Sequence, residues 1–518
     1  MMRYVKILWL GWWSCWILFP FAHVSASALT LGWSKMPRSV DPRFASDEGS
    51  FILSQMTHCA LIGHNQQHQP VGHLAKDWAW KSDTELLVNL KENVFFADGT
   101  PVDAQAVKHT YDYLRQSSGL KNPSPFVGAF RDLESVRVVS PTRLVFVLKK
   151  YREFFPDDLV VGILPPKFVQ DKQVSVRDQV QGCGPFVLQQ QSLLGLSLVA
   201  NPKYSLGPVA QVTKLHIRVV KDSSTMLAKL IKHEIDLAHE MLTFDSYARI
   251  EKQHTDLKLY VTHLPQTSYV GFNMEHPILK HKLVRRAIAM AIDREAILKY
   301  ILDGRAEVAH TFLPPQNRFY AANTPKLAFD VKKAQQLLEE AGYPVDPSKG
   351  VRFGLKLSTS NSDMSMAFAQ TIASNLSKIG IAVQHRSSEW AKFKLDLEKG
   401  RAQMWILQSV GIKTPEIYQA MLSQKRIPPH GPNRGRFIHA GLEKLFGEVE
   451  ATRDAEQLQA LYARIQHVTA EEAPYAFLFH NHLIYVAAKS VRGMEQSQSL
   501  DYAQLMTRLS RADVASSR

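Results

Sequence analysis

Histidines are the residues whose type and spacing are best suited to chemistry, and the chain has 20 of them. His64 and His68 lie four residues apart, with His58 and His73 nearby, and imidazole nitrogens are common ligands of transition metals. Their segment, HNQQHQPVGH, has the composition of a turn, holds no cysteine or acidic residue, and lacks the glutamate of an H-E-x-x-H motif. We interpret it as a solvated loop, with metal binding as the alternative.

Sequence signatures of the common enzyme classes are missing. No G-x-x-x-x-G-K-[ST] phosphate loop occurs, GCGPFV holds only the first two glycines of a dinucleotide fingerprint, and GWSKM and GLSLV lack the second glycine of a nucleophile elbow. His480 and His482, in FLFHNHLIYV, have the spacing of one strand face and are interpreted as structural. We infer a protein without enzymatic activity or cofactor, and a secreted hydrolase on an unrelated fold is the less favoured alternative.

The composition indicates a globular chain of more than one lobe. Its 518 residues are too many for one ordinary core, and the hydrophobic content of 45% is enough to fill two. The formal net charge is +14, yet lysine and arginine are spread along the chain without a run of five or six like charges. We therefore expect no nucleic-acid partner.

The first 28 residues have the pattern of a secretory signal peptide. Arg3 and Lys6 precede an apolar run over 7–22, and small residues follow at 25–28. The run is shorter than the roughly 20 residues that a membrane-spanning helix needs. We expect cleavage after Ala28, or else after Ala26, and a periplasmic or otherwise extracytoplasmic protein.

Cleavage leaves two cysteines, Cys59 and Cys183, in the mature chain. An exported chain can join such a pair in one disulfide, but sequence separation says nothing about the distance between their Cα atoms. Whether they pair stays open at this point.

The elements that must position any site alternate between strands and helices. KLHIRVV, a helix over Ser223–Lys232 and IDLAHEM form one such unit, and a second alternation runs from Tyr269 to about Glu472. Asp103 and Asp330 are expected to cap helices. This order predicts an α/β fold with mostly parallel sheets and helices on their faces.

A basic helix is predicted within GFNMEHPILKHKLVRRAIAMAIDREAILKYILDG, residues 271–304. Its apolar positions have the period of one helix packed on a sheet, with Gly304 as the stop. Arg285, Arg286 and Arg294 lie close to Asp293 and Glu295, which favours ion pairs on a solvated face. We interpret these arginines as scaffold and surface residues.

Several segments together resemble one family, the extracellular solute-binding proteins of oligopeptide and dipeptide ABC importers. The resemblance spans almost the whole mature chain, and the order of the segments is its strongest feature. The segments are NVFFADGTPVDAQAVKHTYDYL, GCGPFVLQQ, YVGFNMEHPILKHKLVRRAIAMAIDREAIL, LPP at 313–315, FDVKKAQQLLEEAGYP, IGIAVQ and NRGRF at 433–437.

The resemblance implies a two-lobed periplasmic-binding-protein fold of the type II, peptide-binding class, with an extra subdomain and a hinge. Lobe I would comprise 29–264 plus 480–518, with the subdomain at about 60–180, and lobe II would comprise 265–479. Such a protein closes on a solute and presents it to the permease subunits of an ABC importer. We expect a monomer that binds a peptide or peptide-like solute.

Peptide-binding members of the family pair the peptide's amino group with an aspartate in a Trp-x-x-Asp segment. Here residues 401–415 contain no acidic residue, and Gln408 stands at the matching offset from Trp405. Either Glu389 or Glu416 substitutes, or the ligand has no ammonium group there. The second case admits blocked peptides, sugars, haem or a metal chelate. The candidate ligand-binding residues are Trp390, Trp405, Gln408, Ser409, Gly411, Asn433 and Ser39, and no resident metal is expected.

Overall fold

The computed structural model describes residues 28–65, 67–168, 181–239, 242–496 and 502–511. The predicted signal peptide lies outside these residues except for Ala28, the first residue of β1 (Ala28–Trp33). Among the described residues, no helix is both long and apolar enough to cross a membrane.

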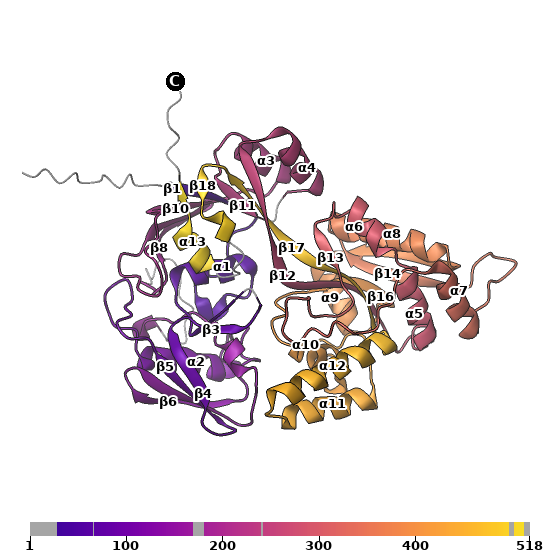
Figure 1. The fold of residues 1–518 in the computed structure, drawn as a ribbon, viewed down its shortest axis with the longest axis horizontal. Coiled ribbons are helices and arrows are strands. Elements are labelled where there is room, and N and C mark those ends of the chain that lie inside the picture. The colour runs from indigo at the N-terminus through magenta and orange to yellow at the C-terminus, as the bar shows by residue number, and fades with distance from the viewer. Residues whose placement is uncertain (1–27, 66, 169–180, 240–241, 497–501, 512–518) are drawn as a thin grey trace, which may run out of the picture.

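One eleven-stranded sheet runs through the molecule (Figure 1). In its first half, β1 pairs in parallel with β10 (Lys214–Val219) and β11 (Leu237–His239). In its second half, β14 (Phe353–Ser360) pairs in parallel with β15 (Ile381–Ser388) and β16 (Met404–Ser409). The remaining pairs are antiparallel, so the sheet is mixed, and the expectation of mostly parallel sheets is not met. They involve β8 (Phe186–Ser192), β9 (Gly195–Ala200), β12 (Leu257–Phe272), β13 (Ala306–Val308) and β17 (Tyr475–Ala488).

Two long antiparallel strands, β12 and β17, join the two halves of the sheet (Figure 1). The lower-numbered part of β12 lies beside the first half, and its last residues pair with β16 of the second half. The register of the β12–β17 pair shifts between His263 and Thr267, and again between Ser268 and Tyr269. Such irregularities bend and twist a strand pair locally.

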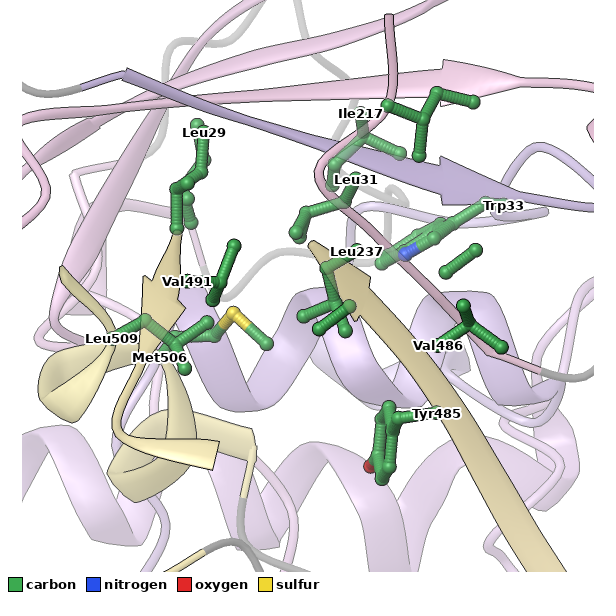
Figure 2. Packing of buried hydrophobic residues seen from close by; sticks show 14 of the residues in the cluster. Leu29, Leu31, Trp33, Ile217, Leu237, Tyr485, Val486, Val491, Met506 and Leu509 are labelled. Carbon is green, nitrogen blue, oxygen red and sulfur yellow. The ribbon is translucent and has the colours of Figure 1, made fainter. Parts of the chain in front are cut away.

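The C-terminal segment returns to the first half of the sheet. Leu29, Leu31 and Trp33 of β1 share a buried cluster with Met506 and Leu509 (Figure 2). Alternate residues of β1 thus face helix α13 (Tyr502–Arg508), which also packs on α1 (Glu48–Thr57). A second core, built on Val284, Ile288 and Leu357 among others, fills the other half.

A separate four-stranded antiparallel sheet is inserted into the first half, in the order β4-β5-β7-β6. Its strands are β4 (Ala75–Trp80), β5 (Glu85–Leu90), β6 (Leu133–Ser140) and β7 (Arg143–Leu148). Helix α2 (Ala104–Gln116) covers it and is capped by Asp103, as predicted. The hairpin of β2 (Ile62–His64) and β3 (Pro70–Gly72) precedes this sheet.

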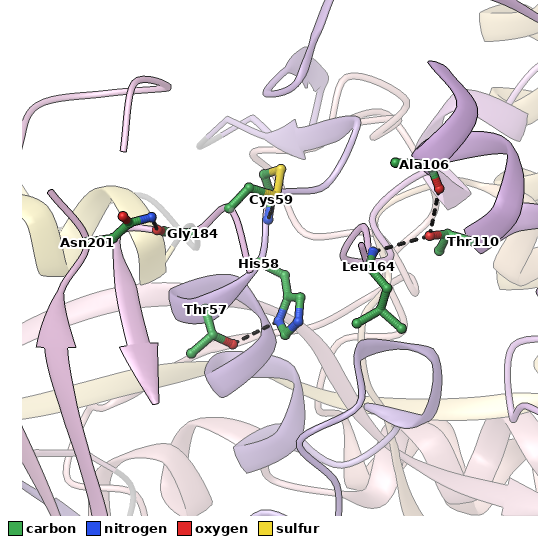
Figure 3. The surroundings of a disulfide bond; sticks show 9 residues. Thr57, His58, Cys59, Ala106, Thr110, Leu164, Gly184 and Asn201 are labelled. Atoms are coloured by element: carbon green, nitrogen blue, oxygen red, sulfur yellow. Dashed lines mark hydrogen bonds between the residues drawn. A yellow bond between two sulfur atoms is a disulfide. The ribbon is translucent and has the colours of Figure 1, made fainter. Parts of the chain in front are cut away.

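Cys59 and Cys183 form a disulfide, which resolves the question left open by the sequence (Figure 3). Their Cα atoms are 5.2 Å apart although 124 positions separate them in the chain. Both cysteines are fully buried. The disulfide therefore links the beginning of the inserted segment covalently to its end.

The single helix predicted within 271–304 is two helices, α5 (Lys282–Ala291) and α6 (Arg294–Tyr300). Ile292 is extended, and the side chain of Asp293 accepts a hydrogen bond from the Ala296 N–H, which starts the second helix. The prediction missed this break because an Asp can cap a helix within an otherwise continuous apolar period. Helix α6 also ends at Tyr300, before Gly304.

The arginines of this region are not on a solvated face as predicted. Arg285 and Arg294 are 3% and 6% exposed. Arg285 donates to the carbonyls of Ala473 and Glu472, and Arg294 to those of Phe477 and Ala289. Arg286 is half-buried and donates to the Glu471 carbonyl.

Several of the remaining helices pack on strands of the sheet. Helix α7, which Asp330 caps as predicted, packs on α5, and α8 packs on β14 and β15. The remaining helices are α3 (Ser223–Ile231), α4 (Phe244–Gln253), α7 (Val331–Glu340), α8 (Asp363–Ser377), α9 (Trp390–Glu398), α10 (Glu416–Leu422), α11 (Ala440–Ala451) and α12 (Ala455–Glu472).

Candidate functional site

Charged residues of the inserted segment face the segment that follows β16. Lys413 Nζ lies 3.2 Å from His64 Nδ1 and 5.8 Å from the ring centre of Phe51. Arg152 lies 3.7 Å from Glu416 Oε2. We call His64, Arg152, Asp157, Asp158, Lys413 and Glu416 the facing cluster, because its members come from both sides of the β12–β17 junction.

His64 is held against Asp157, with Nε2 3.0 Å from Oδ1. Both side chains are buried, at 3% and 8% exposed. Burial raises the pKa of Asp157 to about 6, although Arg318 and Lys413 oppose the shift. A carboxyl group with this pKa exchanges its proton in the mildly acidic range.

The solvated-loop interpretation of the 58–73 histidines is wrong. His58, at the end of α1, and His64 and His68, in the β2–β3 hairpin, are 4%, 6% and 4% exposed. Burial lowers the pKa of His58 and of His68 to about 4, and nearby Lys413 and His64 add to the shift of His68. His58 and His68 are therefore neutral at pH 7.

We expect Asp157→Asn to change how stability depends on pH. The carboxyl is protonated in both states at low pH, and between about pH 4 and 6 the unfolded chain loses its proton first. The folded wild type is therefore progressively destabilised as pH rises, by at most about 3 kcal/mol. Urea unfolding at pH 4, 5, 6 and 7 should show the variant gaining stability relative to wild type by that amount. A difference that does not vary with pH would contradict the raised pKa.

Glu416 is paired across the facing cluster and Glu389 is used locally. Arg152 bonds Asp158 at 2.9 Å and lies near Glu416, while burial raises the pKa of both carboxyls. Glu389 accepts a hydrogen bond from the Ala391 N–H at the start of α9. Neither carboxylate therefore replaces the missing aspartate beside Gln408 as an unpaired group.

Gln408 lies exposed near the end of β16 and donates to Gln266 Oε1 at 2.8 Å. The pair presents two amides beside the junction, so this position carries no charge. Ser409 ends the strand opposite Thr267. Gly411 follows with φ of +70°, a left-handed conformation that favours glycine.

The two tryptophans have different surroundings. Trp405 is 2% exposed and packs with Phe393 and Leu397, and a side chain at Gly271 would collide with its ring. Trp390 is 53% exposed at the start of α9, so its ring is open to contact.

Asn433 and Ser39 are buried and shape their own loops. The Asn433 amide donates to the carbonyls of Ser423 and Phe437 and accepts from the Phe437 N–H. Ser39 Oγ donates to the Asp41 carbonyl. Ligand contact by the seven predicted residues stays a prediction, and sequence reasoning missed Arg152, Asp157, Asp158 and Lys413. The turn FFPDD at 154–158 was the available signal.

The comparisons with known proteins settle the class of the chain. The family model for bacterial extracellular solute-binding proteins, family 5 middle, matches residues 69–426. The chain belongs to this family. It is thus a family 5 solute-binding protein, a component of an ABC transporter.

Relatives of this family 5 protein extend the match over most of the chain. The nickel-binding periplasmic protein of Escherichia coli is 24% identical over 476 residues, which cover 88% of this chain and 89% of the relative. The oligopeptide-binding protein AppA of Bacillus subtilis, solved with a nonapeptide, has a TM-score of 0.75 at 23% identity and covers 94% and 99% of the two chains.

A third solved structure shares the fold of this family 5 protein. NikZ of Campylobacter jejuni, solved with Ni(L-His), has a TM-score of 0.78 at 20% identity, covering 94% of this chain and all of NikZ. The predicted two-lobed α/β class is confirmed by these structures.

Proposed function

We propose that this family 5 protein captures a peptide or peptide-like solute between two lobes and delivers it to the permease of an ABC importer. The signal peptide at 1–28 directs it to the periplasm, where it acts as a monomer without catalysis. Lobe I comprises 29–264 plus 480–518, and lobe II comprises 265–479. The two strands β12 and β17 form the hinge.

The facing cluster is the observation that carries this proposal. Lys413 and Glu416 on one side meet His64 and Arg152 on the other, beyond the two strands that link the halves. Buried charges need partners, so residues brought together by closing must either pair with one another or bind a solute. A ligand that binds between the lobes replaces the contacts within these pairs by contacts with its own polar groups.

The uncharged side chain of Gln408 limits the kinds of solute that this position can bind. An amide offers an uncharged acceptor, whereas a buried ammonium needs a carboxylate to compensate its desolvation. The neutral Gln408–Gln266 pair therefore supports a peptide whose amino end is blocked or lies elsewhere. Mass spectrometry of the solutes released from protein purified from its native compartment tests this. Recovery of only free-amino peptides would contradict it.

Gln408→Asp is expected to create selectivity for a free amino group. Wild type should bind the free-amino and N-acetylated forms of one recovered peptide with similar affinity. The variant should prefer the free form by at least about tenfold, because a charge-assisted bond replaces a neutral one. Isothermal titration measures both, and Gln384→Asp, the same change on exposed β15, is the control. Equal affinities in Gln408→Asp would show that this position does not meet the ligand's end.

A metal chelate is the second candidate solute. The buried ring of His68 lies near Lys413 and His64, and neither of its nitrogens has a hydrogen-bond partner among the described residues. A neutral imidazole beside a cation suits an anionic metal complex. Equilibrium dialysis against nickel–histidine and iron–EDTA complexes tests this candidate, and absence of retention removes it.

A further inference from the structure

Three potential metal ligands meet where β12, β13 and β17 lie side by side. They are His263, Glu307 and His482, and their ligand atoms all lie within 4.8 Å of one another. His263 Nδ1 is 3.5 Å from Glu307 Oε1, and the rings of His263 and His482 have centres 4.8 Å apart. This cluster shares no residue with the facing cluster, although His263, like Lys413 and His64, lies close enough to act electrostatically on His68.

The backbone fixes this arrangement. His263 is the direct cross-strand partner of His482 in the antiparallel β12–β17 pair. Glu307 of β13 pairs with His480, two positions from His482 on the same strand, so its side chain is a diagonal neighbour of His482. Pairing thus brings His263 together with Glu307 and His482, which lie 44 and 219 positions further along the chain.

The state of His482 suits a ligand. Its Nε2 is buried without a hydrogen-bond partner among the residues the structure describes. A buried polar atom of this kind usually has a protein or solvent partner.

We propose that His263, Glu307 and His482 bind a divalent first-row transition-metal ion such as Zn²⁺ or Ni²⁺. Two imidazoles and one carboxylate form a ligand set that such ions prefer over Mg²⁺ or Ca²⁺. Water completes the coordination, because Glu307 and His263 are 35% and 44% exposed. The site goes beyond the proposed solute binding, since it lies on the strands that join the halves.

The geometry requires only small side-chain movements. Zinc–nitrogen bonds of about 2.0–2.1 Å hold two ligand atoms at most about 4.2 Å apart, and the three ligand atoms here already lie within 4.8 Å of one another. His263 and Glu307 are partly exposed and free to turn toward an ion. Once bound, the ion ties β13 to β12 and β17 next to the register shift after His263.

Titration of the full mature chain tests the site. Protein stripped with EDTA is titrated with Zn²⁺ and with Ni²⁺ in a calorimeter, and Co²⁺ is used as a spectroscopic probe. We expect one site, with affinity lowered at least about tenfold in His263→Gln and in Glu307→Gln. The Co²⁺ d–d absorption should also be lost in His263→Gln.

His233→Gln is the matched control, because His233 forms another partly exposed histidine–carboxylate pair, with Asp256 at 3.1 Å. It should leave the metal affinity unchanged. His263 and Glu307 are partly exposed, so their variants should fold, which circular dichroism checks. Equal metal affinity in wild type, His263→Gln and Glu307→Gln would overturn the proposal, as would an equal loss in His233→Gln.

Discussion

Arg294→Ala is expected to lower the free energy of unfolding by about 3–5 kcal/mol. The guanidinium is 6% exposed and donates to the Phe477 carbonyl at 2.6 Å and to the Ala289 carbonyl at 2.9 Å. Alanine leaves these carbonyls buried without a donor and opens a cavity between α6 and β17. Urea unfolding at pH 7 measures the loss.

Arg286→Ala provides the matched control for this prediction. Arg286 precedes the same break in the helix, but it is only half-buried and donates to a single carbonyl among the described residues, that of Glu471. We expect a change within about 0.5 kcal/mol. Comparable losses of unfolding free energy in the two variants would mean that burial of Arg294 does not determine its contribution to stability.

The double replacement of Cys59 and Cys183 by alanine is expected to cost about 2–5 kcal/mol. The disulfide closes 124 positions of sequence separation, so removing it greatly increases the freedom of the unfolded chain. Alanine avoids placing a hydroxyl group in this fully buried site. Thermal unfolding followed by circular dichroism measures the change.

Wild type unfolded in the presence of a reductant is the control for the disulfide. It should lose a similar amount, since it loses the same cross-link. The double variant could instead unfold at the wild-type temperature while the reduced wild type does not. The difference in unfolding temperature between these two proteins would then be caused by the cavity or by the free thiols, and not by loss of the cross-link.

Local features of the fold were predictable from the sequence. Asp103 and Asp330 cap the expected helices, and KLHIRVV and the helix expected at Ser223–Lys232 form β10 and α3. These signals act over a few residues. The placement of Arg294 was not predictable in this way, because its carbonyl acceptor at Phe477 lies 183 positions further along the chain.

The candidate site was less predictable than the fold. The neutral Gln408 position could be found from its spacing to Trp405, but the facing cluster joins His64 to Lys413 across 349 positions. Nothing in HNQQHQPVGH distinguishes a hairpin packed against another lobe from a solvated loop. The metal cluster likewise depends on strand register, which periodicity along one strand does not determine.

The closeness of Cys59 and Cys183 makes the segment between them a transplantable module. With ends 5.2 Å apart, the segment can be exchanged for another of different length without rerouting the surrounding chain. It also carries His64, Arg152 and Asp157, so one side of the facing cluster travels with it. Exchange of this one insert between relatives would therefore replace one side of the facing cluster and leave the rest of the scaffold unchanged.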